Sequence, residues 1–377
     1  MNEMSFDARF ARATPTHVAL IGNAMPRRCG MATFTNHCRD ALFGQFPDIK
    51  IDHYAMDDGR AEVEYPDDIY LIDDKDSRSY ARAALHIEES GAEAIWLQHE
   101  FGIFGGSAGE LILHLLARTR LPLVTTFHTI LKNPNADERR VMDQLLARSR
   151  DIIVMSELGR TLLQRVYGVA DHRISVIPHG VPDRPRVDAD SMKPQFGWAG
   201  RQVILTFGLL APDKGIQHMI EAMPAIVAQC PGALYVVVGA THPNLIREQG
   251  EKLREDLIAL THNLGVADHV QWVDAYQEQE ELLDQLQAAD VYVTPYTNPA
   301  QVTSGTLSYA VSMGKAVVST PYVHATEILD ADHGILVPFR DSPAMAEAII
   351  GLLTDDAARE AYGQRAYARG RNMLWRE

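Results

Sequence analysis

Short apolar runs alternate with segments of helical periodicity along most of the chain. In the first half, the runs that predict buried strands lie at residues 17–21, 49–54, 94–98, 123–127, 151–154 and 174–177. Segments with helical spacing fit between them, at about 31–46, 108–118 and 138–148. Strands that alternate with helices and short loops pair in parallel, so this half predicts a doubly wound α/β sheet.

The alternation stops in a stretch rich in Pro, Asp and Gly, which predicts a linker at residues 181–200. Beyond it, the expected strands lie at residues 203–207, 234–238, 269–273 and 291–294. The expected helices lie at residues 215–229, 245–264 and 279–289. We therefore predict two Rossmann-like domains, residues 1–180 and 201–377, with a cleft between them.

Size and charge narrow the classes of function. A chain of 377 residues is too long for one ordinary core, and 46% hydrophobic with 23% charged residues is typical of a globular protein. The formal net charge of −15 argues against a nucleic-acid partner, because neutralising phosphates requires clustered Lys and Arg. It also argues against docking on an anionic membrane.

The sequence also carries no targeting or cross-linking signal. No apolar run approaches the roughly 18 residues of a transmembrane helix. Residues 1–16 are polar and lack the apolar core of a signal peptide. Cys29, Cys38 and Cys230 form neither a zinc spacing nor a disulfide framework. A cytoplasmic location is therefore expected, and no oligomeric state follows from the sequence.

The most informative stretch for function is residues 294–321. It reads as the end of a strand, a polar loop, a helix that begins near Ser304, a stop at Gly314 and a further strand. The Ser304-Gly305-Thr306 sequence at a helix start leaves backbone N–H groups that point outward, which suits an anion such as phosphate. Thr303 is a further candidate for the same ligand.

This stretch resembles the donor-site segment of retaining glycosyltransferases of family 4, which have the GT-B fold. Further likenesses run from about residue 17 to 375. The family has two glutamates in this segment, where this chain has Gln301 and Tyr309. Gln301 can still exchange hydrogen bonds with a sugar hydroxyl. Tyr309 offers one hydroxyl where a carboxylate would hold a ribose, and core packing is the alternative role for it.

A second donor-site segment covers residues 207–215, where an expected strand ends and a helix begins. The resemblance implies that Lys214 holds the diphosphate of the donor. A Lys at such a point neutralises a leaving phosphate as a point charge. The family usually has an Arg where this chain has Leu209, so one of two cations is replaced.

The first domain contributes a loop at residues 22–33. Gly30 matches a Gly that faces the donor phosphates in the family, and Gly lets a backbone approach a ligand closely. An ordinary strand-to-helix turn is the alternative. Arg27 and Arg28 favour an anionic ligand, and we assign them to the acceptor.

Two expected strand ends carry further candidates, since ligands of open α/β sheets bind beyond the carboxyl ends of the strands. His128 matches the His that the family places beside the donor sugar. His99 and Glu100 are candidate acceptor contacts. A structural hydrogen bond is the alternative for His99, and capping of the next segment is the alternative for Glu100. No metal-binding set emerges from these residues, and the resemblance implies none.

The sequence thus predicts a retaining glycosyltransferase that moves a hexosyl group from a nucleotide diphosphate sugar to a sugar or glycan acceptor, without metal or other cofactor. His128, Lys214 and Gln301 are its predicted catalytic residues. Two alternatives stay open: a catalytically weak sugar-nucleotide-binding protein, and a sugar phosphorylase that uses free phosphate. Residues 372–377 read as a helix. In the family a last helix runs back to the first domain, so either the chain is trimmed or this crossover is absent.

Overall fold

A computed structural model describes residues 15–59, 64–275, 277–330 and 332–377. The expectation that no signal peptide is present falls almost wholly on residues 1–14, which lie outside the described residues. Contacts divide the chain into two compact units. The first unit holds residues up to 154 together with 162–175, and the second holds 155–161 together with 176–375.

The first unit is built on a seven-stranded sheet in the order β3-β2-β1-β4-β5-β6-β7. Its strands are β1 (His17–Gly22), β2 (Lys50–Asp57), β3 (Ile69–Asp73), β4 (Ala94–His99), β5 (Leu123–Phe127), β6 (Asp151–Val154) and β7 (Ile174–Val176). The pairs from β3 through β6 are parallel. This is the doubly wound order that the alternation of strands and helices predicts.

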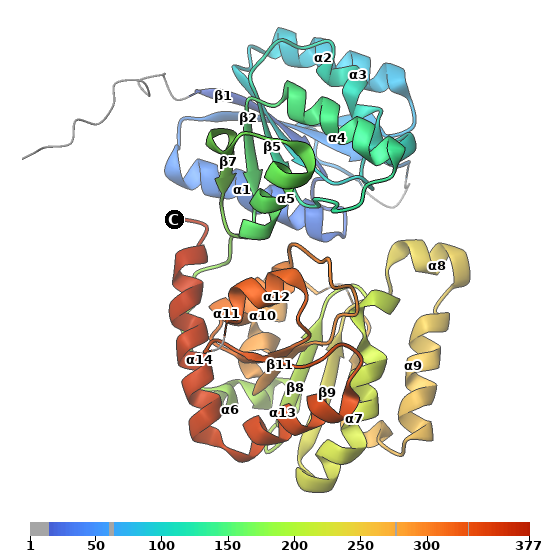
Figure 1. Ribbon diagram of the computed structural model, residues 1–377, viewed down its shortest axis with the longest axis vertical. Coiled ribbons are helices and arrows are strands. Elements are labelled where there is room, and N and C mark those ends of the chain that lie inside the picture. Colours follow the sequence, from blue (N-terminus) through green and yellow to red (C-terminus); the bar gives the residue numbers. More distant parts are fainter. Residues whose placement is uncertain (1–14, 60–63, 276, 331) are drawn as a thin grey trace, which may run out of the picture. The chain divides into compact units, whose positions relative to one another are not determined.

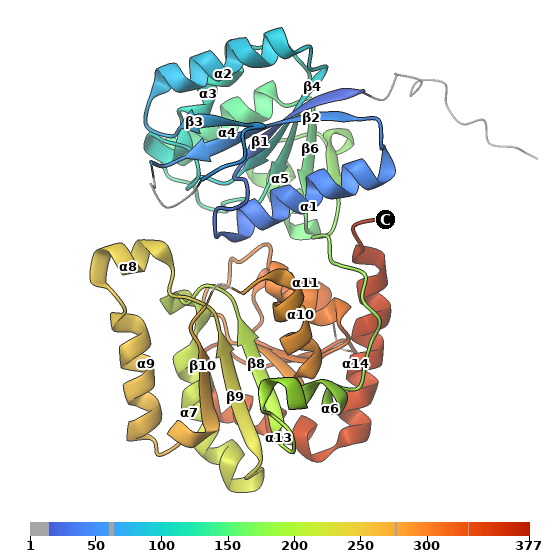
Figure 2. The same ribbon diagram turned by 180° about the vertical axis from the view of Figure 1, so that it is seen from behind.

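Helices cover both faces of this sheet. They are α1 (Gly30–Gln45), α2 (Ser77–Ser90), α3 (Ile112–Leu116), α4 (Ala136–Arg148) and α5 (Glu157–Tyr167). Figures 1 and 2 show α2, α3 and α4 on one face and α1 on the other. The predicted helix at 108–118 is shorter than expected. Ala108 (φ 51°) and Gly109 (φ 76°) have left-handed backbone conformations, so regular helix begins only at Ile112.

The second unit is built on a six-stranded sheet in the order β10-β9-β8-β11-β12-β13, with parallel pairs. Its strands are β8 (Gln202–Phe207), β9 (Ala233–Val238), β10 (Val270–Val273), β11 (Val291–Thr294), β12 (Ala316–Ser319) and β13 (Ile335–Leu336). Its helices are α6 (Ala189–Met192), α7 (Ile216–Gln229), α8 (Pro243–Gln249), α9 (Lys252–Asn263), α10 (Gln279–Ala288), α11 (Gly305–Ser312), α12 (Val323–Ile328), α13 (Ser342–Thr354) and α14 (Asp356–Gly370).

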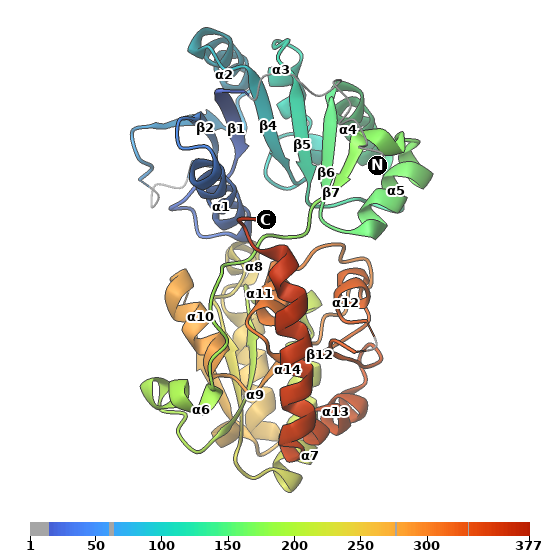
Figure 3. The same ribbon diagram turned by 90° about the vertical axis from the view of Figure 1, so that its left-hand side faces the viewer.

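The sheet of the second unit separates two apolar cores. Because side chains alternate across a strand, Leu205 and Phe207 of β8 enter one core and Ile204 enters the other. The first core takes side chains from α10, α11, α12 and α14, and the second takes them from α7, α9 and α13. Figure 3 shows α14 beside α11 on the first of these faces.

Three segments of the second unit differ from the sequence prediction. The helix expected at 245–264 is two helices, α8 and α9, because Gly250 turns left-handed (φ 65°) between them. Residues 372–377 form no regular α-helix, because Leu374 leaves a 3₁₀ turn to bridge Val181 in parallel. The predicted linker at residues 181–200 contains the helix α6 and the buried Trp198. Trp198 is 1% exposed in the first core and donates to Gln271 Oε1 at 2.8 Å.

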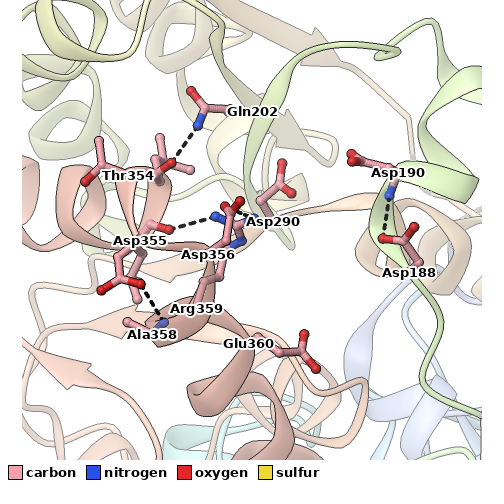
Figure 4. Close-up of polar contacts among 12 residues, drawn as sticks. Asp188, Asp190, Gln202, Asp290, Thr354, Asp355, Asp356, Ala358, Arg359 and Glu360 are labelled. Atoms are coloured by element: carbon pink, nitrogen blue, oxygen red, sulfur yellow. Dashed lines mark hydrogen bonds and ion pairs between the residues drawn. The ribbon is translucent and has the colours of Figure 1, made fainter.

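A polar cavity of about 420 Å³ lies at the amino ends of β11 and β12. Figure 4 shows Asp188, Asp190, Asp290 and Glu360 among its acidic residues. Lys315 lines it as well, although the side chain is almost fully buried. Its Nζ donates to the carbonyl oxygens of Gln287 (2.7 Å) and Ala289 (3.0 Å), at the end of α10. Lys315 therefore completes the hydrogen bonding of a helix terminus.

Lys315 should give folding stability a measurable dependence on pH. Burial lowers the pKa of Lys315 to about 7, whereas an unfolded Lys has a pKa of about 10.4. Between these values the unfolded chain binds more protons, so stability should rise with pH. We expect the free energy of unfolding of the parent, relative to Lys315→Met, to rise by up to about 1.4 kcal/mol per pH unit from pH 7 to 9.

Urea denaturation at several pH values would measure this difference. The carbonyl oxygens that Lys315→Met leaves without a donor cost the same at every pH, so they do not affect the slope. Lys252→Met is the control, because Lys252 is exposed and forms its ion pair with Asp256 on its own helix. Parallel pH profiles for the parent and Lys315→Met would contradict the prediction.

Candidate functional site

Two loops of the second unit meet beyond the carboxyl ends of β8 and β11. The loop after β8 leads into a 3₁₀ turn at Pro212–Lys214, and the loop after β11 leads to α11. The backbone N–H of Thr297 donates to the carbonyl of Asp213 at 2.8 Å. Gly215 is packed so closely that an added Cβ would lie 2.0 Å from the carbonyl oxygen of Pro295. The two loops therefore form one tightly packed surface.

Tyr296 connects Lys214 to the start of α11. The Nζ of Lys214 lies 4.3 Å from the centre of the Tyr296 ring. The hydroxyl of Tyr296 is 2.9 Å from Oγ1 of Thr306, which is 3.1 Å from Oγ of Ser304. The structure thus brings Lys214 together with Ser304 and Thr306, which the sequence predicted from a separate motif. Tyr296 itself was not predicted.

Lys214 is a half-buried cation whose charge is retained. Burial by itself lowers the pKa of Lys214, but the neighbouring Tyr296 and Asp213 outweigh this effect and the pKa is raised. The nearest carboxylate oxygen, Oδ2 of Asp213, is 3.5 Å from Nζ. Leu209, where the family resemblance leads one to expect an Arg, is half-buried two residues after β8 and adds no charge.

The start of α11 has two backbone N–H groups left over. Ser304 is the N-cap, and its Oγ accepts from the N–H of Leu307. The N–H of Ser304 donates to Nδ1 of His324 at 2.9 Å. Among the described residues, no acceptor is bonded to the N–H groups of Gly305 and Thr306. These two groups lie at the positive end of the helix dipole and suit an anion.

Gln301 and Thr303 lie in the loop before α11. Nε2 of Gln301 donates to the carbonyl of Thr303 at 2.6 Å, and the carbonyl of Gln301 accepts from the N–H of His324 at 3.1 Å. Both residues are half-buried. Gln301 therefore uses its side-chain N–H₂ group to shape the loop, while its side-chain oxygen, Oε1, has no donor among the described residues.

Tyr309 lies mostly in the first core of the second unit. It is 7% exposed, and its ring centre lies 6.3 Å from that of Phe207 and 6.1 Å from that of His179. His179 in turn lies against the start of α11, since a Cβ added at Gly305 would be 2.8 Å from its Nε2. Tyr309 thus packs behind the helix start, where a charged side chain would have little access to solvent.

In the first unit, His128 follows β5 and pairs with Gln98 of β4. Nε2 of His128 is 3.1 Å from Oε1 of Gln98. An amide oxygen only accepts, so Nε2 of His128 carries the proton in this contact. The ring of Phe34 meets the His128 ring edge-on, with 4.7 Å between centres. Gln98 was not predicted, although it lies in the same motif as His99.

His99 and Glu100 differ from each other in their surroundings. His99 has no exposed surface, and the rings of Phe101, Phe104 and Phe127 surround it. Burial lowers its pKa to about 3, so the ring is neutral. His99 thus lies in an apolar enclosure of the first unit, and its predicted acceptor contact stays a prediction. Glu100 accepts hydrogen bonds from Thr129 Oγ1 (2.6 Å) and the N–H of Phe101 (2.9 Å), and burial raises its pKa.

The loop between β1 and α1 carries the other predicted residues of the first unit. Arg28 and Gly30 are exposed. Arg27 forms an ion pair with Asp58 at 3.1 Å and donates to the carbonyl of Met56. Cys29 caps α1, because its Sγ accepts from the N–H of Ala32. The Arg27 side chain is thus held by its own domain, while Arg28 is open to solvent.

The described residues contain no group of three or more His, Cys, Asp or Glu side chains placed to hold a metal ion. None of their helices combines the length and apolar composition needed to cross a membrane.

Sequence comparison finds two family matches. The family "Glycosyltransferase Family 4" matches residues 51–184, and "Glycosyl transferases group 1" matches residues 201–355. The chain is 28% identical to phosphatidyl-myo-inositol mannosyltransferase of Mycolicibacterium smegmatis, over 71% of this chain and 66% of that protein. It is 29% identical to D-inositol 3-phosphate glycosyltransferase of Xylanimonas cellulosilytica, over 78% of this chain and 72% of that protein.

Structural comparison finds the same fold. Anabaena HepE in complex with UDP superposes with a TM-score of 0.74 at 19% identity, covering 96% of each chain. Sucrose-phosphate synthase from Thermosynechococcus elongatus superposes with a TM-score of 0.75 at 17% identity, covering 95% of each chain. The two family matches fall on both units and the fold agrees over nearly the whole chain, which supports a glycosyltransferase of family 4 with the GT-B fold.

Proposed function

We propose that this glycosyltransferase moves a hexosyl group from a nucleoside diphosphate sugar to a carbohydrate acceptor, with retention of configuration and without a metal ion. The observation that carries the proposal is the cluster at the start of α11. Tyr296 connects a charged Lys214 there to two hydroxyls, beside two backbone N–H groups that have no acceptor among the described residues. The HepE structures with UDP, and with UDP and glucose, support a nucleotide sugar as donor.

The cluster supplies what a departing diphosphate needs. Lys214 provides a positive charge, and the N–H groups of Gly305 and Thr306 provide fixed dipoles at the helix start. In the proposed step the bond from the sugar C1 to the phosphate oxygen breaks, and a bond from C1 to the acceptor oxygen forms on the same face. The acceptor proton passes to the departing phosphate. The cationic cluster thereby takes the place of a bound metal cation.

The remaining predicted residues take supporting roles in this proposal. His128 and the side-chain oxygen of Gln301 would contact the donor sugar, and Thr303 and Leu209 would border the nucleotide. The open Gly30 loop would approach the phosphates, while Glu100 and the exposed Arg28 would meet the acceptor. The relatives named for inositol phosphate and phosphatidylinositol acceptors support an acceptor that carries negative charge.

A thermal-shift screen followed by a transfer assay would test the function. A ligand that binds only the folded protein adds about 2.7 kcal/mol of stability when its concentration is 100 times its Kd, and the melting temperature rises as a result. We expect shifts with a nucleoside diphosphate and its sugar, and then transfer from that sugar. Binding without transfer to any acceptor would favour the weak binding protein instead. Activity that requires inorganic phosphate and no nucleotide would favour the phosphorylase.

Restoring the family's two glutamates should harm this protein. At position 309 a carboxylate would enter an apolar surrounding beside Phe207, which costs free energy and raises its pKa. At position 301 it would face the carbonyl of Thr303 and lose the 2.6 Å hydrogen bond. We expect the Gln301→Glu, Tyr309→Glu double variant to transfer at least about tenfold more slowly and to be less stable.

Transfer rates and urea midpoints of the parent, both single variants and the double variant would measure this. Tyr309→Phe is the control, because it keeps the packing and removes only the hydroxyl. A double variant that transfers faster than the parent would mean that Gln301 and Tyr309 mark a loss of activity, not an adapted site.

A further inference from the structure

The first turn of α12 fixes the loop that precedes α11. The N–H of Val323 donates to the carbonyl of Pro299 at 3.2 Å, and the N–H of His324 donates to the carbonyl of Gln301 at 3.1 Å. The third bond runs the other way, from the N–H of Ser304 to Nδ1 of His324 at 2.9 Å. A segment twenty residues further along the chain therefore holds both ends of the loop.

The imidazole of His324 acts in this arrangement as an acceptor. It is 2% exposed, and burial, with a smaller effect of His179, lowers the pKa of His324 to about 3. A neutral ring has one nitrogen with a lone pair, whereas an imidazolium has two donors. Since Nδ1 accepts from Ser304, the ring proton is on Nε2. The hydrogen bond to Ser304 is thus available at any pH near neutrality.

This bond decides which N–H groups at the helix start remain for a ligand. A helix start has four N–H groups without partners inside the helix. Here the first is bound by His324, and the fourth, that of Leu307, is bound by Oγ of Ser304. The two in the middle, on Gly305 and Thr306, are adjacent to the hydroxyl of Thr306 that leads through Tyr296 to Lys214.

We propose that His324 is a positioning residue of the diphosphate site. Its Nδ1 fixes the backbone of Ser304, so that the N–H groups of Gly305 and Thr306 point at the phosphates that Lys214 neutralises. The proposal rests on the proposed function, because it assumes that a diphosphate binds there. His324 acts through the backbone of Ser304 and is not assigned a contact with the donor.

Three substitutions separate this role from simple packing. His324→Asn keeps an acceptor oxygen near the position of Nδ1. His324→Gln keeps a polar side chain but moves its acceptor one bond further out, and His324→Leu fills similar space with no acceptor. Isothermal titration of UDP, GDP, ADP and inorganic pyrophosphate would measure affinity. Pyrophosphate reports on the phosphate site without a base. Melting temperatures without ligand would report on folding.

We expect His324→Asn to bind diphosphate within about threefold of the parent, and the Gln and Leu variants to bind at least about tenfold more weakly, as for loss of a well-placed hydrogen bond to a charged group. Parent-like affinity in the Leu variant, or equal losses in all three variants, would overturn the positioning role and leave the proposed function standing. If the Leu variant does not fold, the diphosphate affinities of the Asn and Gln variants decide instead. Equal affinities in these two variants would overturn the positioning role. A parent that binds none of the four probes would overturn both proposals.

Discussion

Lys214→Ala should weaken binding of the nucleoside diphosphate by about 1.5–3 kcal/mol, the range for hydrogen bonds to charged groups. This corresponds to an increase in Kd of about ten- to 150-fold. Transfer should fall further, by about 10²–10³-fold, because charge on the departing phosphate grows in the transition state. Leu209 supplies no second cation near this loop, so the parent depends strongly on Lys214.

Isothermal titration with diphosphates and initial transfer rates would measure these effects. Lys214→Arg should retain part of the affinity, because the charge remains while the geometry changes. Lys252→Ala is the matched control, since it removes an equal charge from an exposed site on α9 of the same unit. Unchanged diphosphate affinity in Lys214→Ala would show that the α11 start is not the phosphate site.

Gly215→Ala should be among the most destabilising single changes in the second unit. The backbone at Gly215 is left-handed (φ 65°), and the added Cβ would lie 2.0 Å from the carbonyl oxygen of Pro295. A backbone atom cannot move aside as a flexible side chain can, so the two loops must separate. We expect a loss of more than about 3 kcal/mol of stability, as for other steric conflicts in packed backbone.

Gly197→Ala isolates the part of this cost that comes from backbone conformation alone. Gly197 is also left-handed (φ 73°), but a Cβ there has no neighbouring atom within 4 Å. That variant should lose only about 1–2 kcal/mol. Urea midpoints would compare the two. Because separation of the loops also moves Lys214 away from Tyr296, Gly215→Ala should lose diphosphate affinity while Gly197→Ala keeps it. Equal stability of the two variants would contradict the steric argument.

The strand pattern was predictable where an apolar run is bounded by turn residues. Leu123–Phe127, Asp151–Val154 and Val291–Thr294 have the boundaries that periodicity indicates. The strand Ile69–Asp73 and the helix Ser77–Ser90 were not predicted. Leu71 in that strand is 40% exposed, and charged residues flank the short run on both sides, so its pattern resembles a loop. Edge strands bury only part of their side chains and give a weaker signal.

The candidate site was predictable only as far as local motifs reach. Lys214 and Ser304-Gly305 stand at strand-to-helix turns, where backbone geometry and sequence coincide. Tyr296, His324 and Gln98 were missed because their roles come from contacts between segments that are distant in the sequence. The surroundings of His99 could not be predicted for the same reason. The polar motif around it gave no sign that Phe101, Phe104 and Phe127 enclose the ring.

The two apolar cores of the second unit differ in how much they support the candidate site. Tyr296, Leu307, Tyr309 and Tyr322, which support the α11 start, all belong to the first core. The second core, to which α7 contributes Ile220 and α13 contributes Ile349, contains none of them. Leu210 and Ile216, which lie at the two ends of the Lys214 loop, do belong to the second core. An engineer who needs a more stable catalyst should therefore repack this core away from that loop, at positions such as Ile226 and Ile349, where a gain in stability need not reduce turnover.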